Sequence, residues 1–167
     1  VRTHRQAVAG KQPNIVFIMS DDHGPWAWGR DGHPDAVTPA MNRLADSGCV
    51  LNRCFSISPV CSPARACLLT SRYSTETGIT DFLGKDPQIG LESDFVTWPE
   101  LLQRSGYAAG LFGKWHVGEL DRHHPVRHGY DEFKGWRTGA GLSKDPVVEI
   151  DGKNEKVNGY TSDILAD

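Results

Sequence analysis

The sequence predicts an α/β fold with a largely parallel central sheet flanked by helices. The segment Asn14–Met19, with the apolar run Ile15–Met19, has the length and the β-branched residues of a strand that is buried on both faces. Further along the chain, strand-like runs alternate with helix start signals, an order that is typical of parallel sheets. Of the 167 residues, 38% are hydrophobic and 23% are charged, a balance that excludes a disordered, collagen-like or coiled-coil chain.

Two more segments are predicted to be strands. Cys49–Ser56 follows the helix that we expect over residues 38–48, and Tyr107–Phe112 follows the helix that we expect over residues 97–106. Glycine and proline return in residues 121–141, which we expect to be irregular. Residues 1–12 are polar and lack periodicity, so we expect a flexible lead-in there, left by cleavage of a signal peptide or by an arbitrary chain boundary. The folded part is then residues 13–167.

Helix start signals precede four segments. Thr38-Pro39 combines a capping threonine with a proline in the first turn, and Gly48 ends this helix. Ser62-Pro63 repeats the signal before the apolar segment Ala64–Thr70. Thr97-Trp-Pro-Glu100 matches a capping box, in which the two side chains bind each other's backbone N–H groups. The expected helices are residues 38–48, 62–70, 97–106 and 161–167.

Charge and hydropathy exclude two classes of partner. The net charge is −3 and the isoelectric point is about 6.2, so we expect no nucleic-acid partner. No apolar run reaches the roughly 18 residues that a membrane span requires. The chain is therefore expected to fold as a globular piece without a membrane span.

The cysteines do not form a zinc or disulfide pattern. No Cys-x-x-Cys pair occurs, and four cysteines in 167 residues are too sparse for a disulfide scaffold. We expect three of them to be free buried thiols, although a Cys49–Cys54 bridge stays open. The fourth, Cys61, stands directly before an expected helix start. The cysteines are Cys49, Cys54, Cys61 and Cys67.

Chemically useful residues follow the predicted strands. In open α/β sheets, ligands bind beyond the carboxyl ends of the strands. Asp21 and Asp22 follow the first apolar run, and Lys114 and His116 follow Tyr107–Phe112. Paired carboxylates favour a hard cation, whereas lysine and histidine favour an oxyanion.

A nucleophile position lies at the second expected helix. Cys61 precedes the cap, where free N–H groups and the helix dipole favour an anion. Arg65 comes four residues later, about one helical turn away, so it can reach the same pocket.

The segment Cys61-Ser-Pro-Ala-Arg65 resembles the Cys-x-Pro-x-Arg signature of the sulfatase family. Ala64 stands where many members have serine, a departure that the maturation signal tolerates. The second family signature is matched by Gly113-Lys-Trp-His-Val-Gly118. Further resemblance, in the family's order, is carried by residues 13–22, 38–45, 58–65, 68–73 and 128–131.

The resemblance implies an alkaline-phosphatase-like α/β sandwich, incomplete here, because complete members are several times longer. Residues 13–167 would then be the N-terminal part of the catalytic domain. It also implies that a maturation enzyme, formylglycine-generating or of another type, oxidises Cys61 to formylglycine. The hydrated aldehyde attacks the sulfur of a sulfate ester and expels the alcohol. Its second hydroxyl then loses a proton and expels sulfate, restoring the aldehyde.

The resemblance further implies a role for each matched residue. The cation would be Ca²⁺, with Mg²⁺ as the other option. Arg65 would hold and polarise the diol, and Lys114 and His116 would hold oxygens and manage protons. The implied catalytic residues are Cys61, Arg65, Lys114 and His116, and the implied metal ligands are Asp21, Asp22 and Cys61.

Two other functions stay open at this stage. One is hydrolysis of phosphoesters or phosphonates on the same fold, and the other is a non-catalytic fragment or pseudoenzyme that binds a partner. We expect the chain by itself to be inactive, because the family completes its cation site later in the sequence. We also expect it to self-associate or to need the missing C-terminal region. The expected location is periplasmic or secreted, with a cytoplasmic location as the alternative.

Overall fold

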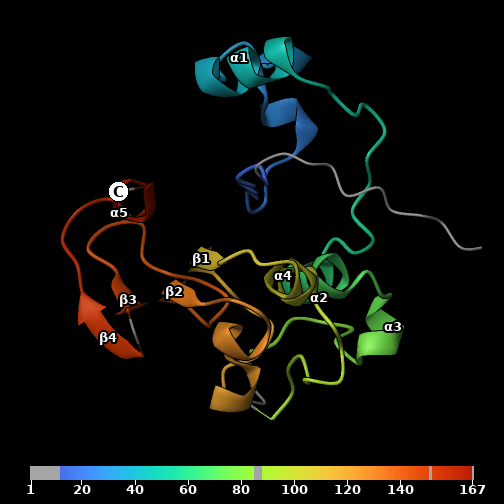
Figure 1. Cartoon of the computed structure of the whole chain (residues 1–167). Helices are drawn as coiled ribbons and strands as arrows, with labels where there is room; N and C mark the ends of the chain where they lie inside the picture. The colour runs from blue at the N-terminus through green and yellow to red at the C-terminus, as the bar shows by residue number, and fades with distance from the viewer. Residues whose placement is uncertain (1–11, 85–87, 151, 167) are drawn as a thin grey trace, which may run out of the picture. The chain divides into compact units, whose positions relative to one another are not determined.

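The computed structural model describes residues 12–84, 88–150 and 152–166 (Figure 1). Except for Gln12, the expected lead-in lies outside the described residues. The chain divides into two compact units, Val1–Asn52 and Arg53–Asp167. Among the described residues, no helix is both long enough and apolar enough to cross a bilayer.

The first unit has no buried side chain among its described residues. It contains two short 3-10 helices, η1 (Pro25–Ala27) and η2 (Gly29–Asp31), and the helix α1 (Pro39–Ser47). The prediction of a buried strand over Ile15–Met19 is wrong for this structure, because the run does not form a strand and all five side chains are exposed. A strand needs neighbouring N–H and C=O groups, and local sequence does not provide them.

Helix α1 confirms the expected start and end. Thr38 is the N-cap residue, Pro39 begins the helix and Gly48 follows its last residue. The Thr38 hydroxyl does not bind the first turn of the helix backbone. It accepts the Gly29 N–H at 3.2 Å and donates to Asn42 Oδ1 at 3.1 Å, so it ties η2 to α1.

The strand expected over Cys49–Ser56 is absent, because those residues form turns and irregular structure. All four cysteines are free thiols. Cys67 is buried as expected, whereas Cys49 and Cys54 are exposed and unbridged.

The second unit contains a mixed four-stranded sheet in the order β1-β2-β3-β4. The strands are β1 (Gly110–Lys114), β2 (Glu132–Trp136), β3 (Val147–Ile150) and β4 (Lys153–Lys156). The α/β class is confirmed, but in the described part of the chain only β1 and β2 pair in parallel, and the other two pairs are antiparallel.

Two strand boundaries differ from the predictions. β1 begins three residues later than the expected strand and includes Lys114 as its last residue. β2 lies inside residues 121–141, which were expected to be irregular. Its Gly135 is required, because a Cβ there would lie 1.9 Å from the carbonyl oxygen of Gly113 on β1. The glycine that suggests a loop therefore permits close strand pairing.

The helices of this unit are α2 (Cys61–Thr70), α3 (Ser74–Thr77), α4 (Trp98–Arg104) and α5 (Thr161–Ala166). Two 3-10 helices, η3 (Asp121–His123) and η4 (Pro125–Arg127), lie in the supposedly irregular segment. α2 begins one residue earlier than expected, with Val60 as the N-cap residue. Ser62 therefore does not cap it, and its hydroxyl accepts the Leu83 N–H at 3.2 Å.

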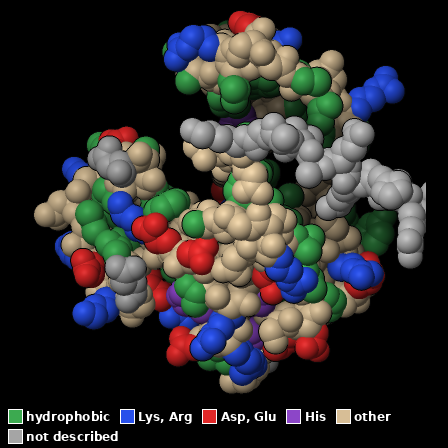
Figure 2. Space-filling model, viewed as in Figure 1, with side chains coloured by type: hydrophobic (Ala, Val, Ile, Leu, Met, Phe, Trp, Pro, Cys, Tyr) green, Lys and Arg blue, Asp and Glu red, His purple; other side chains and the backbone are tan. Residues whose placement is uncertain are grey.

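The hydrophobic core lies in the second unit. Trp115 is 2% exposed, and Trp98 packs against the cluster. Many other hydrophobic side chains stay at the surface, where Figure 2 shows them in green. The buried cluster comprises Ala66, Leu69, Ile79, Leu83, Leu91, Trp115, Val117, Tyr130 and Phe133.

The block His128-Gly-Tyr-Asp131 has a structural role in this unit. The His128 carbonyl accepts the Thr97 hydroxyl at 2.7 Å. Gly129 has φ +88° and lies against the first turn of α4, where a Cβ would be 2.2 Å from the Glu100 nitrogen. Asp131 accepts the Ala109 N–H at 2.8 Å, just before β1. The block thus fixes α4 and β1 relative to each other.

Candidate active site

Arg65 on α2 and Lys114 at the end of β1 are in direct contact. Arg65 Nη1 donates a hydrogen bond to the carbonyl oxygen of Lys114 at 2.7 Å, across 49 positions of sequence. Arg65 lies one helical turn after Cys61, and residues at that spacing are neighbours on a helix surface. The two sequence signatures therefore meet in the second unit.

Cys61 is the first residue of α2 and is partly exposed. The first N–H groups of a helix have no partner within it, and its N-terminus favours negative charge. Cys61 thus lies where the helix backbone favours negative charge, and Arg65 follows one helical turn later.

His116 is held in a buried and strained position. It is 1% exposed, and its φ of +57° lies in the left-handed region, which costs a non-glycine residue about 1–3 kcal/mol. Its Nε2 lies 2.9 Å from the Leu83 carbonyl oxygen, and the Phe82 ring meets its ring edge to face at 4.7 Å.

Asp21 and Asp22 lie in the first unit and are exposed. Asp22 has φ +50°. Four described non-glycine residues have a positive φ, and two of them, Asp22 and His116, are expected site residues. Such strain concentrates at functional sites. The grouping of Asp21 and Asp22 with Cys61 stays a prediction.

The carboxylate oxygens of Asp21 and Asp22 are of the type that a hard cation binds, but they are too few to complete its coordination. Carboxylate oxygens are the ligands that Ca²⁺ prefers, and it takes about 6–8 oxygens. Within the residues that the structure describes, no group of three or more His, Cys, Asp or Glu side chains could hold a metal ion.

Two buried histidines were not among the predicted site residues. His123 and His128 are both fully buried. A Cβ on Gly90 or Gly118 would lie within 2.6 Å of the His123 ring, so both glycines give it room. Burial lowers the pKa of His128, because desolvation disfavours the charged imidazole. Gly118, in the second signature, was the feature of the sequence that could have indicated the buried His123.

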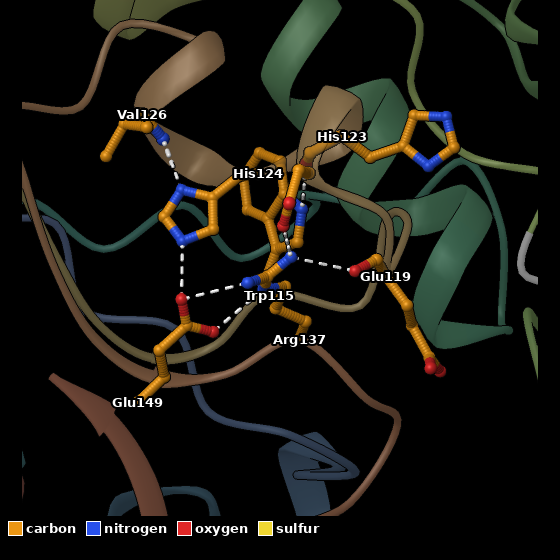
Figure 3. A network of polar contacts seen from close by, with 8 residues as sticks. Trp115, Glu119, His123, His124, Val126, Arg137 and Glu149 are labelled. Atoms are coloured by element: carbon orange, nitrogen blue, oxygen red, sulfur yellow. Dashed lines mark hydrogen bonds and ion pairs between the residues drawn. The ribbon is translucent and has the colours of Figure 1, made fainter. Parts of the chain in front are cut away.

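A largely buried ion network joins Arg137, Glu149 and His124, with Trp115 drawn among them (Figure 3). Arg137 donates to both oxygens of Glu149, at 2.7 and 3.0 Å, and His124 Nε2 lies 2.9 Å from Glu149 Oε1. Burial alone would raise the pKa of Glu149, but the hydrogen bonds from Arg137 and His124 lower it. Arg137 also binds the Glu119 carbonyl at 2.9 Å, which ties the segment after β1 to β3.

The sulfatase family model matches residues 13–167. The chain is 34% identical over 160 residues to an N-acetylglucosamine-6-O-sulfatase of Bacteroides thetaiotaomicron, covering 94% of this chain and 26% of that protein. It is 36% identical to the steryl-sulfatase of Mus musculus, covering 85% of this chain and 26% of that protein. The crystal structure of Ps i-CgsB superposes with a TM-score of 0.89 at 30% identity, covering 93% of this chain and 40% of that chain.

The chain thus spans about a quarter of the length of the curated relatives that it matches. The matched region includes both signatures, the Cys61 helix and the end of β1. The family model covers more than half of the chain, and the relatives share more than 30% of their residues with it over most of its length. The chain belongs to the sulfatase family.

Proposed function

We propose that the protein is a sulfuric ester hydrolase that acts through formylglycine formed from Cys61. The observation that carries the proposal is the 2.7 Å hydrogen bond from Arg65 to the Lys114 carbonyl, which joins the Cys-x-Pro-x-Arg helix to the Gly-Lys-Trp-His strand. A sulfate ester needs a nucleophile and cationic groups that stabilise the oxygens of its transition state. Cys61, Arg65 and Lys114 supply those groups within one unit.

Each residue has a separate task in this proposal. The converted Cys61 supplies the hydroxyl that attacks sulfur, at a helix start that favours the anionic ester. Arg65 and Lys114 hold negatively charged oxygens, and His116 moves a proton. Asp21, Asp22 and Cys61 would hold the divalent cation, which we expect to be Ca²⁺ and which would supply Lewis-acid polarisation of the ester.

The substrate class stays broad, because the relatives differ in what their names state. One is an N-acetylglucosamine-6-O-sulfatase and another is a steryl-sulfatase. We infer a sulfate ester of an alcohol or a phenol, and we expect the chain by itself to lack activity. Formation of the nucleophile requires a maturation enzyme, and we keep a periplasmic or secreted location as a prediction.

The test measures conversion and turnover in the full-length protein, produced together with a maturation enzyme. Peptide mass spectrometry of residues 54–65 should show Cys61 as formylglycine and Cys54 as a thiol. The protein should hydrolyse an aryl sulfate faster than the matching aryl phosphate. The reverse preference would favour a phosphoester or phosphonate hydrolase. Failure to convert Cys61 together with no turnover would favour a non-catalytic protein.

A further inference from the structure

The His116 ring lies against three residues outside the two sulfatase signatures. Its Nε2 lies 2.9 Å from the Leu83 carbonyl oxygen, and the Phe82 ring lies against it at 4.7 Å between centroids. The backbone of Gly139 also approaches the ring, so closely that a Cβ there would lie 2.8 Å from both Cε1 and Nε2 and 2.9 Å from the Phe82 ring.

The hydrogen bond to Leu83 fixes the tautomer of the ring. A carbonyl oxygen only accepts hydrogen bonds, so the nitrogen facing it must carry the proton. Nε2 is therefore the N–H nitrogen, and it is committed to a structural bond. Any proton that His116 exchanges with a bound molecule must then pass through Nδ1.

The N–H group of the same residue, Leu83, is anchored to the Cys61 helix. The Leu83 N–H donates to the Ser62 hydroxyl at 3.2 Å, and Ser62 is fully buried directly after Cys61. Leu83 itself is 9% exposed and belongs to the hydrophobic core. Two hydrogen bonds, one on each side of the Leu83 Cα, thus link the nucleophile helix to the imidazole through the Leu83 backbone.

We propose that the Ser62–Leu83 hydrogen bond and the backbone of Gly139 are positioning elements that hold His116 as the Nε2–H tautomer, so that Nδ1 is its working nitrogen in sulfate ester hydrolysis. This inference rests on the proposed function. Ser62 and Gly139 act through His116, and neither needs to contact the substrate.

The first measurement is the tautomer in the full-length protein. Nitrogen-15 labelling of the histidine rings, with the His116 signals assigned by their loss in His116→Gln, reports which nitrogen carries hydrogen. A proton on Nε2 is expected, and a proton on Nδ1 alone would overturn the proposal. If the wild-type protein is inactive on aryl sulfates but shows the Nε2–H tautomer, the proposed function fails while the tautomer assignment stands.

A pair of His116 variants separates structure from chemistry. His116→Gln keeps an amide donor toward the Leu83 carbonyl, whereas His116→Leu fills similar space without a donor. We expect His116→Gln to melt close to wild type and above His116→Leu, while both lose about 10²-fold or more in turnover. Equal melting temperatures for the two variants would show that Nε2 holds no structural bond and would overturn the proposal.

Two further variants test positioning directly. Gly139→Ala should displace the His116 ring and lower kcat by about 10-fold to 100-fold. Ser62→Ala should also lower kcat. The matched control is Gly141→Ala in the same loop, whose Cβ would contact the Trp136 ring at 3.0 Å and not His116. Turnover is normalised to the fraction of Cys61 converted, measured by mass spectrometry.

The double variants complete the test. In the His116→Gln background, Gly139→Ala should cost little further turnover, because its effect acts through the imidazole. An equal loss in both backgrounds, or a loss for Gly141→Ala as large as for Gly139→Ala, would show a general effect on the fold and overturn the positioning role.

Discussion

Arg65 on α2 donates a charged hydrogen bond to the backbone of Lys114 on β1, at 2.7 Å. Hydrogen bonds from charged donors contribute about 1.5–3 kcal/mol, and this one is partly screened because Arg65 is only half-buried. The contact therefore serves the fold as well as the proposed site, since it joins two segments far apart in sequence.

We expect Arg65→Lys to lower the free energy of unfolding of the protein by about 1 kcal/mol and to reduce sulfate ester turnover. Lysine keeps the charge but lacks the planar fork that directs Nη1 at the carbonyl. Urea unfolding and aryl sulfate kinetics measure the two effects. Arg72→Lys is the control, because Arg72 forms an exposed pair with Glu76 that contributes little to stability. Equal effects of the two substitutions would contradict this role of Arg65.

Local signals predicted the helices well and the sheet poorly. Thr38-Pro39 and the Thr97–Glu100 capping box correctly locate α1 and α4, because a helix is started by residues that are near in sequence. The apolar run Ile15–Met19 looks like a strand, yet its ladder depends on a distant partner. β2 was missed because its two outward-facing polar residues and Gly135 resemble a loop.

The candidate site was predicted in part, and for a physical reason. Motif spacing places Arg65 one turn after Cys61, and the structure brings Lys114 to it. Asp21 and Asp22 belong to the first unit, so their grouping with Cys61 stays untested. The Leu83 carbonyl that holds His116 could not be predicted, because a backbone group leaves no mark in the sequence.

The capping box of α4 should be sensitive to loss of a single hydroxyl. Thr97 is fully buried, its N–H donates to Glu100 Oε2 at 2.7 Å and its hydroxyl donates to the His128 carbonyl at 2.7 Å. We expect Thr97→Val to reduce the unfolding free energy by about 1–3 kcal/mol, because a buried carbonyl loses its donor. Thr97→Ser keeps the hydroxyl and should lose less in the same urea titration. A Thr97→Val protein as stable as Thr97→Ser would argue against the hydroxyl's contribution.

The Glu149 network should make the fold sensitive to acid. The folded-state pKa of Glu149 is lowered although burial alone would raise it, since Arg137 and His124 bind its charged form. Its stabilising contribution is present above the unfolded pKa of about 4.3 and is lost as pH falls through the lower folded value. Unfolding curves between neutral pH and pH 3 should show a weaker pH dependence for Glu149→Gln than for wild type.

A partner substitution tests the same network at neutral pH. Arg137→Gln leaves the Glu149 carboxylate with only His124, and breaking a buried ion pair costs about 3 kcal/mol. We expect a large drop in melting temperature, which recovers partly in the Arg137→Gln, Glu149→Gln double variant. If the double variant loses as much stability as the two single variants together, the result would contradict coupling between Arg137 and Glu149.

A divalent cation should stabilise the full-length protein through Asp21 and Asp22. A ligand that binds the folded state raises the melting temperature with its concentration. We expect Ca²⁺ to raise the melting temperature of the wild-type protein and a chelator to abolish sulfate ester turnover. Asp22→Asn should weaken the Ca²⁺ effect, whereas Asp35→Asn, an exposed carboxylate in the same unit, should not. Equal responses of both variants would remove Asp22 from the proposed ligand set.

The exposed run Ile15–Met19 should make the chain associate when it is produced as these 167 residues. Val16 and Ile18 are 82% and 83% exposed, and an exposed apolar segment of strand length is a template for pairing between copies. We expect light scattering to show oligomers that the Val16→Glu, Ile18→Glu variant reduces. Leu142→Glu is the control, because Leu142 is also 65% exposed but lies outside any such run. If Leu142→Glu reduces association as much, general surface hydrophobicity and not the run drives it.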